Sequence, residues 1–251
     1  MNAAAVHSGP LRRIGFRALG CAISIAVEEQ AGHAPLERLP AWFHSCERAL
    51  SRFHSDSELS QLNGHPCRPV PASPLLWHAM LAALEAAQWT EGLVHPAMLP
   101  AIEHAGYDRD FAQLAVTNPG KQASPEPMTR DWHDIAIGER THTITLPEGM
   151  RLDFGGTAKG WIADHVAAAL THHGPALVNA GGDIAIRDSA TRRSWPSGIL
   201  DPLHPGATLG RVHVQAGGIA TSGRDHRRWQ VGQQWQHHII DPRTGAPAIT
   251  D

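Results

Sequence analysis

The sequence predicts an α+β fold. Segments with the 3.6-residue periodicity of amphipathic helices concentrate in the first half of the chain, and segments that alternate like strands concentrate in the second half. Runs of helices followed by runs of strands are typical of α+β proteins rather than of alternating βαβ folds. The 251 residues, of which 42% are hydrophobic, are enough to bury a sizeable core.

The first part of the chain contains a strand and a helix. Residues 1–10 are expected to form a flexible tail, and 21–27 alternate with period 2, which predicts a strand. Residues 36–53 predict an amphipathic helix, and residues 54–72, which are polar and contain proline, predict a loop. The apolar positions of this helix are Leu39, Trp42, Phe43, Cys46, Ala49, Leu50 and Phe53.

A second helix has clear boundary signals. Ser73 is a favoured capping residue, Pro74 suits the first helical position, and Gly92 suits the C-terminal end. A short helix is expected within 93–107, and a loop within 108–134, where proline and glycine interrupt regular structure.

The second half is expected to be mostly strands. Residues 141–146 alternate like a strand, and 151–156 lead into a helix over about 157–170. Further strands are expected at 176–180, 183–187, 211–216, 228–231 and 235–240. Because the chain shows no internal repeat and no low-complexity linker, residues 11–251 are expected to form one domain.

Composition excludes several classes of protein. The formal net charge is -3 and there is no long basic run, so a nucleic-acid partner has no electrostatic support. The three cysteines form no CxxC pair, and the 18 histidines show no HExxH spacing. No stretch approaches a membrane span. Since no signal peptide or lipoprotein signal is visible, a cytoplasmic location is expected, or a periplasmic one if a leader was removed.

The strongest local motif is the run LDFGGTAKGWIAD over residues 152–164. A predicted strand ends at two glycines, Thr157 can cap, and a helix begins, which presents free N–H groups and the positive helix end to a phosphate. Lys159 lies in the first helical turn, where a cation is electrostatically disfavoured. From these residues alone, a phosphate site and an ordinary strand–turn–helix connection are equally good interpretations.

Three further segments combine strands with small or turn-forming residues. The run NAGGD over 179–183 predicts a hairpin turn or a close approach to a ligand. The run ATSG over 220–223 is rich in hydroxyl groups, and HIIDPRTGAP over 238–247 predicts a turn closed by aspartate and threonine. These patterns by themselves do not specify a reaction.

Taken together, the motifs resemble the ApbE family of FAD:protein FMN transferases. The N-terminal run FRALGC is similar to the family's MGT element, with Leu19 and Cys21 in place of Met and Thr. The runs LSRF and DSELSQLN over 50–63, EGLVHP over 91–96 and the four segments above follow in family order. The resemblance covers roughly residues 14–247 and implies a T-fold-like α+β structure of helices and antiparallel sheet in one compact unit.

The resemblance implies a reaction and its partners. FAD would be the substrate, Mg²⁺ would assist, and FMN would pass to a Thr or Ser hydroxyl of an acceptor protein as AMP leaves. Lys159 and Asp153 would be catalytic, and the backbone carbonyl of Gly156 would bind Mg²⁺. The residues that would bind FAD are Leu19, Phe53, Leu93, Val94, His95, Asp153, Lys159 and Thr221.

Two departures from the family pattern leave alternatives open. His95 stands where the family has an acid, and the sequence stops at Asp251. On that basis the domain is expected to be incomplete at its C-terminal end, lacking a strand and a helix with an Asp-x-x-x-Thr pair of metal ligands. The alternatives are a catalytically weak FAD-binding relative and an FAD pyrophosphatase that releases FMN and AMP.

Overall fold

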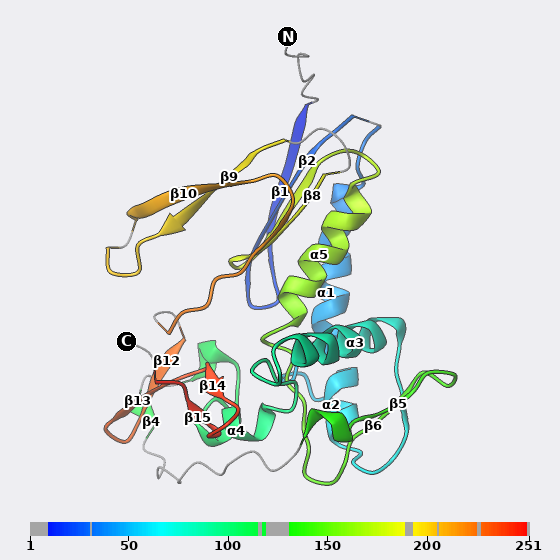
Figure 1. Ribbon diagram of the computed structural model, residues 1–251, viewed down its shortest axis with the longest axis vertical. Coiled ribbons are helices and arrows are strands. Elements are labelled where there is room, and N and C mark those ends of the chain that lie inside the picture. Colours follow the sequence, from blue (N-terminus) through cyan, green and yellow to red (C-terminus); the bar gives the residue numbers. More distant parts are fainter. Residues whose placement is uncertain are drawn as a thin grey trace. The chain divides into compact units, whose positions relative to one another are not determined.

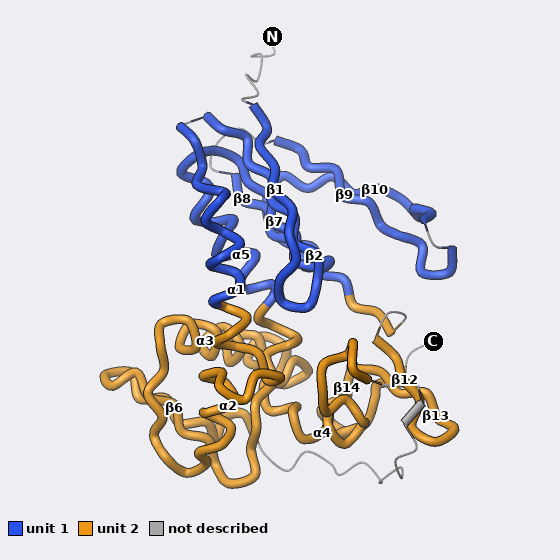
Figure 2. The backbone as a smooth tube through the Cα atoms, turned by 180° about the vertical axis from the view of Figure 1, so that it is seen from behind, with its two compact units in different colours: residues 1–45, 159–221 blue, residues 46–158, 222–251 orange. Residues whose placement is uncertain are grey.

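The computed structural model describes residues 10–30, 32–114, 117–118, 131–188, 193–204, 206–224 and 227–249. It contains helices and mostly antiparallel sheets, which confirms the predicted fold class. Residue contacts divide the chain into two compact units (Figure 2), unit 1 from Met1–Ser45 with Lys159–Thr221 and unit 2 from Cys46–Ala158 with Ser222–Asp251. Each unit is therefore assembled from two separate segments of sequence.

Unit 1 is built on a five-stranded antiparallel sheet with the order β1-β2-β7-β8-β11. Its strands are β1 (Leu11–Ala18), β2 (Cys21–Glu28), β7 (Ala176–Ala180), β8 (Asp183–Arg187) and β11 (Gly217–Ile219). A separate hairpin pairs β9 (Trp195–Leu200) with β10 (Thr208–Val214). The predictions for 176–180 and 183–187 match β7 and β8 residue for residue, and the strand expected at 211–216 overlaps β10.

Helices cover one face of this sheet. The 3-10 helix η1 (Leu36–Arg38) leads into α1 (Leu39–Leu50), and α5 (Ala158–Leu170) lies beside α1 (Figure 1). The ring of Phe43 on α1 meets Phe16 of β1 edge-on at 5.2 Å between centroids, and Trp42 stacks on His165 of α5 at 5.6 Å. Phe43 is fully buried in the contact between sheet and helix, whereas His165 lies at the surface.

The sequence did not predict β1. Along this strand Arg13, Gly15 and Arg17 are exposed, whereas Ile14 and Phe16 are partly buried. The segment therefore has a period-2 pattern, but arginines at alternate positions give it a polar composition. β1 is stabilised by its pairing with β2 along its whole length. Its low content of apolar residues does not indicate this stabilisation.

Unit 2 contains the remaining elements. Its helices are α2 (Glu58–Asn63), α3 (Pro74–Trp89) and α4 (Leu99–His104), with the 3-10 turns η2 (Phe111–Gln113) and η3 (Trp132–Asp134). One small sheet has the order β3-β6-β5 and comprises β3 (Val70–Pro71), β6 (Thr143–Thr145) and β5 (Ala136–Gly138). A second has the order β13-β12-β4 and comprises β13 (Gln234–His237), β12 (Arg228–Val231) and β4 (Thr117–Asn118). β14 (Ile240–Asp241) pairs with β15 (Ala246–Pro247).

The boundaries of α3 follow the predicted signals. The side chain of Ser73 accepts a hydrogen bond from the N–H of Leu76, Pro74 is the first helical residue, and Gly92 has a φ of +83° just after the helix. The short helix expected within 93–107 is α4, and the strand expected at 228–231 is β12. Of the loop expected at 108–134, the part over 119–130 lies outside the described residues.

The prediction of a loop over all of 54–72 was wrong. Residues 58–63 form α2, with the Ser57 side chain as its cap, accepting from the N–H of Ser60. Leu59 and Leu62 are fully buried on the inner side of this helix. The helix is too short for its periodicity to stand out from the polar, proline-containing sequence around it.

A core of unit 2 surrounds Trp229, which is 1% exposed and donates from its indole N–H to the carbonyl of Ala105 at 2.8 Å. Gly106, with a φ of +96°, lies against this ring. The other buried members of the cluster are Met98, Ala101, Ile102, Ala105, Tyr107 and Val231. In the part of the chain that is described, no helix is long and apolar enough to cross a membrane.

Candidate functional site

Two tight turns lie at one end of the five-stranded sheet of unit 1. Leu19 and Gly20 join β1 to β2 with φ of 56° and 67°, and Gly181 and Gly182 join β7 to β8 with φ of 65° and 100°. Positive φ at both central residues is the hairpin geometry that glycine favours. Because β2 and β7 are antiparallel neighbours and the Gly181 N–H donates to Ala22 O, both turns emerge at the same end.

The glycine turn is in close contact with two of the motif segments. A Cβ at Gly181 would lie 2.7 Å from Cβ of Cys21, and a Cβ at Gly182 would lie 3.2 Å from Cβ of Thr221. Glycine at these positions therefore lets the side chains of Cys21 and Thr221 pack directly on the backbone. Thr221 itself is exposed.

Lys159 belongs to this same group. Its Nζ donates to Oδ2 of Asp183 at 2.6 Å, and the two side chains are 22% and 20% exposed. Asp183 follows the glycine turn directly, so the first turn of α5 is tied to the start of β8. The carboxylate gives the cation a defined position at a helix end where it is otherwise disfavoured.

In unit 2, Arg52 brings Phe53 and Asp153 together. Its Nε lies 2.7 Å from Oδ2 of Asp153, and its guanidinium lies over the ring of Phe53, 4.2 Å from the centroid. The Arg52 and Asp153 side chains are 6% and 13% exposed, whereas Phe53 is 39% exposed. Phe53 thus presents an aromatic surface to solvent from a rigid, charged support.

The segment Leu93–His95 is attached to the loop that carries Asp153. The Asp153 N–H donates to the carbonyl of Pro96 at 2.8 Å, the Val94 N–H donates to Oγ1 of Thr90, and Nδ1 of His95 accepts from the N–H of Ala97. Val94 and His95 are partly buried and Leu93 is 59% exposed.

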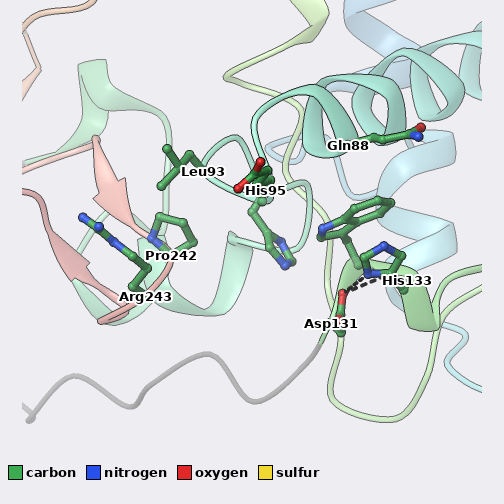
Figure 3. A pocket seen from close by; sticks show the side chains of 10 residues that line it. Gln88, Leu93, His95, Asp131, His133, Pro242 and Arg243 are labelled. Carbon is green, nitrogen blue, oxygen red and sulfur yellow. Dashed lines mark hydrogen bonds and ion pairs between the residues drawn. The ribbon is translucent and has the colours of Figure 1, made fainter.

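Leu93 and His95 line an open cavity of about 840 Å³ within unit 2 (Figure 3). The other lining residues are Gln88, Glu91, Gly92, Asp131, Trp132, His133, Pro242 and Arg243. His95 lies between Pro242 on one side and Asp131 with His133 on the other. The rings of Trp132 and His133 stack at 3.6 Å between centroids. The cavity thus offers aromatic and aliphatic surface together with groups of both charges.

Charged groups at the cavity are held by short hydrogen bonds. The backbone N–H and the ring of His133 lower the pKa of Asp131, which accepts from His133 Nδ1 at 2.6 Å. Arg243 donates to Asp241 and lowers the pKa of that carboxyl to about 2, while the Arg243 side chain stays 75% exposed. Asp241 is therefore ionised at neutral pH and fixes the guanidinium at the cavity edge.

The residues predicted from the sequence thus form two groups. Leu19, Lys159 and Thr221 belong to the end of the unit 1 sheet, whereas Phe53, Leu93, Val94, His95, Asp153 and Gly156 belong to unit 2. Sequence reasoning assigned no role to Arg52, Asp183, Trp132 or Arg243. Arg52 and Asp183 stand inside motifs that were recognised, but nothing in the sequence pairs them with Asp153 and Lys159.

Gly156 is exposed, with no atom within 4 Å of a Cβ built on it. Its surroundings therefore leave room for a ligand. Over the described residues, no group of three or more His, Cys, Asp or Glu side chains could hold a metal ion. The nearest carboxylate in sequence, Asp153, is paired with Arg52.

Comparison with protein families places these motifs in one family. The model of the ApbE family matches residues 19–251 of this sequence. The chain belongs to the ApbE family.

Relatives with assigned names match this chain at moderate identity. An FAD:protein FMN transferase of Treponema pallidum is 34% identical over 241 residues, covering 87% of this chain and 65% of the relative. One of Salmonella typhimurium is 27% identical over 206 residues, covering 79% of this chain and 59% of the relative. The chain therefore spans somewhat less than two thirds of the length of these two proteins.

Solved ApbE structures share the fold. The ApbE protein of Thermotoga maritima superposes with a TM-score of 0.78 at 23% identity, covering 95% of this chain and 79% of that one. The flavinyl transferase ApbE of Pseudomonas stutzeri gives 0.71 at 16% identity, covering 99% and 78%. This chain thus shares the fold of these solved ApbE proteins.

Proposed function

We propose that this chain transfers FMN from FAD to a Thr or Ser hydroxyl of an acceptor protein and releases AMP. The observation that carries the proposal is the Lys159–Asp183 pair at the start of α5, directly beside the glycine turn. A fixed ammonium next to a close-approach backbone is suited to the pyrophosphate of FAD, which is the anionic part of that substrate. The names of the relatives support FAD as that substrate.

In the proposed step, the oxygen of the acceptor hydroxyl forms a bond to the phosphorus of the FMN half. The bond from that phosphorus to the bridging oxygen breaks, AMP leaves with the electron pair, and the hydroxyl proton passes to a base or to water. Lys159 would offset charge that builds on the departing phosphate, and the protein would otherwise act mainly by positioning the two reactants.

The remaining predicted residues fit contacts with the rest of FAD. The exposed face of Phe53 suits stacking on a planar ring, and Leu93 and His95 give the cavity in unit 2 its apolar and polar sides. In the same proposal Leu19, Val94 and Thr221 border the ligand. Asp153 has a place beside FAD by resemblance, although Arg52 and the Gly155 N–H already engage its carboxylate.

In this proposal the only ligands of Mg²⁺ are the backbone carbonyl of Gly156 and the phosphates of FAD. The described residues do not gather the carboxylates that Mg²⁺ normally takes, because Asp153 and Asp183 are each paired with a cation. The donor set therefore does not fit a complete Mg²⁺ site, and no step is assigned to the metal.

Mass spectrometry of a co-expressed flavin-acceptor protein tests the function. With FAD and Mg²⁺ present, the acceptor should gain the mass of FMN, and AMP should appear in equal amount. AMP without the mass gain would identify an FAD pyrophosphatase. FAD binding with neither product would identify a binding protein. This is the second candidate function, because His95 has an imidazole where the family has an acid.

A further inference from the structure

Arg52 is the most fully engaged cation in the described part of unit 2. Besides its 2.7 Å ion pair with Asp153, its Nη2 donates to the carbonyl of Tyr107 at 2.8 Å. The guanidinium lies 4.2 Å from the ring centroid of Phe53 and 4.6 Å from that of Tyr107. A buried guanidinium between two rings and a carboxylate is fixed in orientation, because every direction of motion loses a contact.

The carboxylate of Asp153 is equally committed. Oδ2 binds Arg52, and Oδ1 accepts from the N–H of Gly155 at 2.7 Å. The Asp153 N–H is also used, because it donates to Pro96. Both carboxylate oxygens of Asp153 are thus held in place by groups of unit 2, and each keeps acceptor capacity for a further donor.

Asn63 fastens the same loop one residue earlier. Its Nδ2 donates to the carbonyl of Leu152 at 2.9 Å, and its Oδ1 accepts from the Leu152 N–H at 2.7 Å. A side-chain amide that satisfies both backbone polar groups of one residue holds that segment in place as a paired strand would. Arg52 precedes α2 and Asn63 is its last residue. They stand in the LSRF and DSELSQLN runs, and they bind Asp153 and Leu152 respectively.

Stability alone does not account for the ion pair. Burying an arginine and an aspartate costs desolvation energy that their attraction roughly repays, so such pairs add little net stability compared with apolar side chains. What the pair does supply is geometry, since it sets the positions of Phe53 and of the turn that leads to Gly156. Gly156 itself is exposed.

We propose that Arg52 and Asn63 are positioning residues that hold the loop 152–156, with the Asp153 carboxylate and the Gly156 carbonyl, in its ligand-binding conformation. The ligand part of the inference rests on the proposed function. The clamp itself, defined as Arg52, Asn63, Asp153 and the peptide of Leu152, is a property of unit 2 alone.

Amide hydrogen exchange and FAD titration of Arg52→Gln and Asn63→Ala test the clamp. Exchange should rise in the peptide that covers 151–158 and stay unchanged in α3, and the Kd for FAD should rise on the order of tenfold or more, as for residues that orient ligand-binding groups from behind. Arg48→Gln is the matched control, because Arg48 is an exposed cation in the last turn of α1, just before Arg52. Arg52→Lys keeps the charge but loses the planar guanidinium, so its exchange over 151–158 and its Kd for FAD should lie between those of the wild type and Arg52→Gln. This variant replaces Arg52→Gln if the latter fails to fold.

A double-mutant cycle of Arg52→Gln with Asp153→Asn tests whether Arg52 acts by positioning Asp153. If it does, the double variant should bind FAD about as weakly as Asp153→Asn alone. Additive losses of FAD affinity would show that Arg52 acts independently of Asp153 and would overturn the proposal. Unchanged exchange in both Arg52→Gln and Asn63→Ala would overturn it too. If the wild type does not bind FAD, the proposed function fails while the exchange data still decide the clamp.

Discussion

At the scale of single residues, Lys159 combines an unfavourable helix position with a favourable partner. The positive end of α5 repels its ammonium, and Asp183 compensates at 2.6 Å. With about a fifth of the side chain exposed, the ammonium keeps free donors for a third group. This arrangement is typical of a cation that is held ready for an anion.

Lys159→Ala should therefore weaken FAD binding without unfolding the protein. The loss of one charge-assisted contact is expected to cost on the order of 1–3 kcal/mol, or roughly 5- to 150-fold in affinity. Fluorescence titration with FAD measures the change. Arg13→Ala removes an exposed cation from β1 in the same unit and should bind FAD like the wild type. Normal binding by Lys159→Ala would reduce Lys159 to a structural partner of Asp183.

His237 gives the stability of the protein a pH dependence. Burial lowers the pKa of this imidazole below its usual 6.5, and its Nε2 is hydrogen-bonded to the carbonyl of Ala248. The folded state therefore binds the proton less readily than the unfolded state, so stability is complete above about pH 6.5 and is lost as the pH falls below it.

The substitution His237→Gln should make the stability of the protein depend less on pH below about pH 6.5. The Gln amide can still donate to Ala248 but does not titrate. Melting temperatures measured from pH 7.5 to 5 should fall less steeply for the variant than for the wild type. Parallel profiles would show that protonation of His237 does not contribute to acid destabilisation.

At the scale of elements, the β7–β8 turn is a sterically constrained feature of unit 1. Gly181 has a positive φ, and a side chain there would overlap Cys21. Gly181→Ala should therefore destabilise the protein by about 1–3 kcal/mol, the usual cost of a strained backbone position. Chemical denaturation gives this value directly.

Gly210 provides the comparison for that substitution. It lies in β10 of the same unit, its φ is not in the positive range that L-residues avoid, and a Cβ there would meet no atom within 4 Å. Gly210→Ala should be close to neutral. If Gly181→Ala destabilises the protein no more than Gly210→Ala does, the structure accommodates a Cβ beside Cys21 with little loss of stability.

At the scale of the whole molecule, FAD and FMN should stabilise the protein to different extents. The proposed contacts would cover both halves of FAD, and FMN lacks the adenosine half. A ligand that binds only the folded protein stabilises it by about 2.7 kcal/mol at a concentration 100 times its Kd. At equal concentrations FAD should raise the melting temperature more than FMN. Equal shifts would contradict recognition of the complete dinucleotide.

The sequence by itself determined the local features. Ser73, Pro74 and Gly92 mark the ends of α3, and the glycines at 181 and 182 mark a hairpin, because caps and turns depend on residues close together in the chain. The order of the motifs indicated the ApbE family, which the match over residues 19–251 confirms. The roles of individual site residues stay predictions.

Only the tertiary structure decided which motif residues are partners. Asn63 binds Leu152 across 89 positions of sequence, and Lys159 binds Asp183 across 24, through contacts that no local pattern encodes. The division into units is of the same kind, because each unit joins two distant segments. Caps and turns follow from the neighbouring residues, whereas ion pairs and shared cores depend on where the whole chain brings distant residues together.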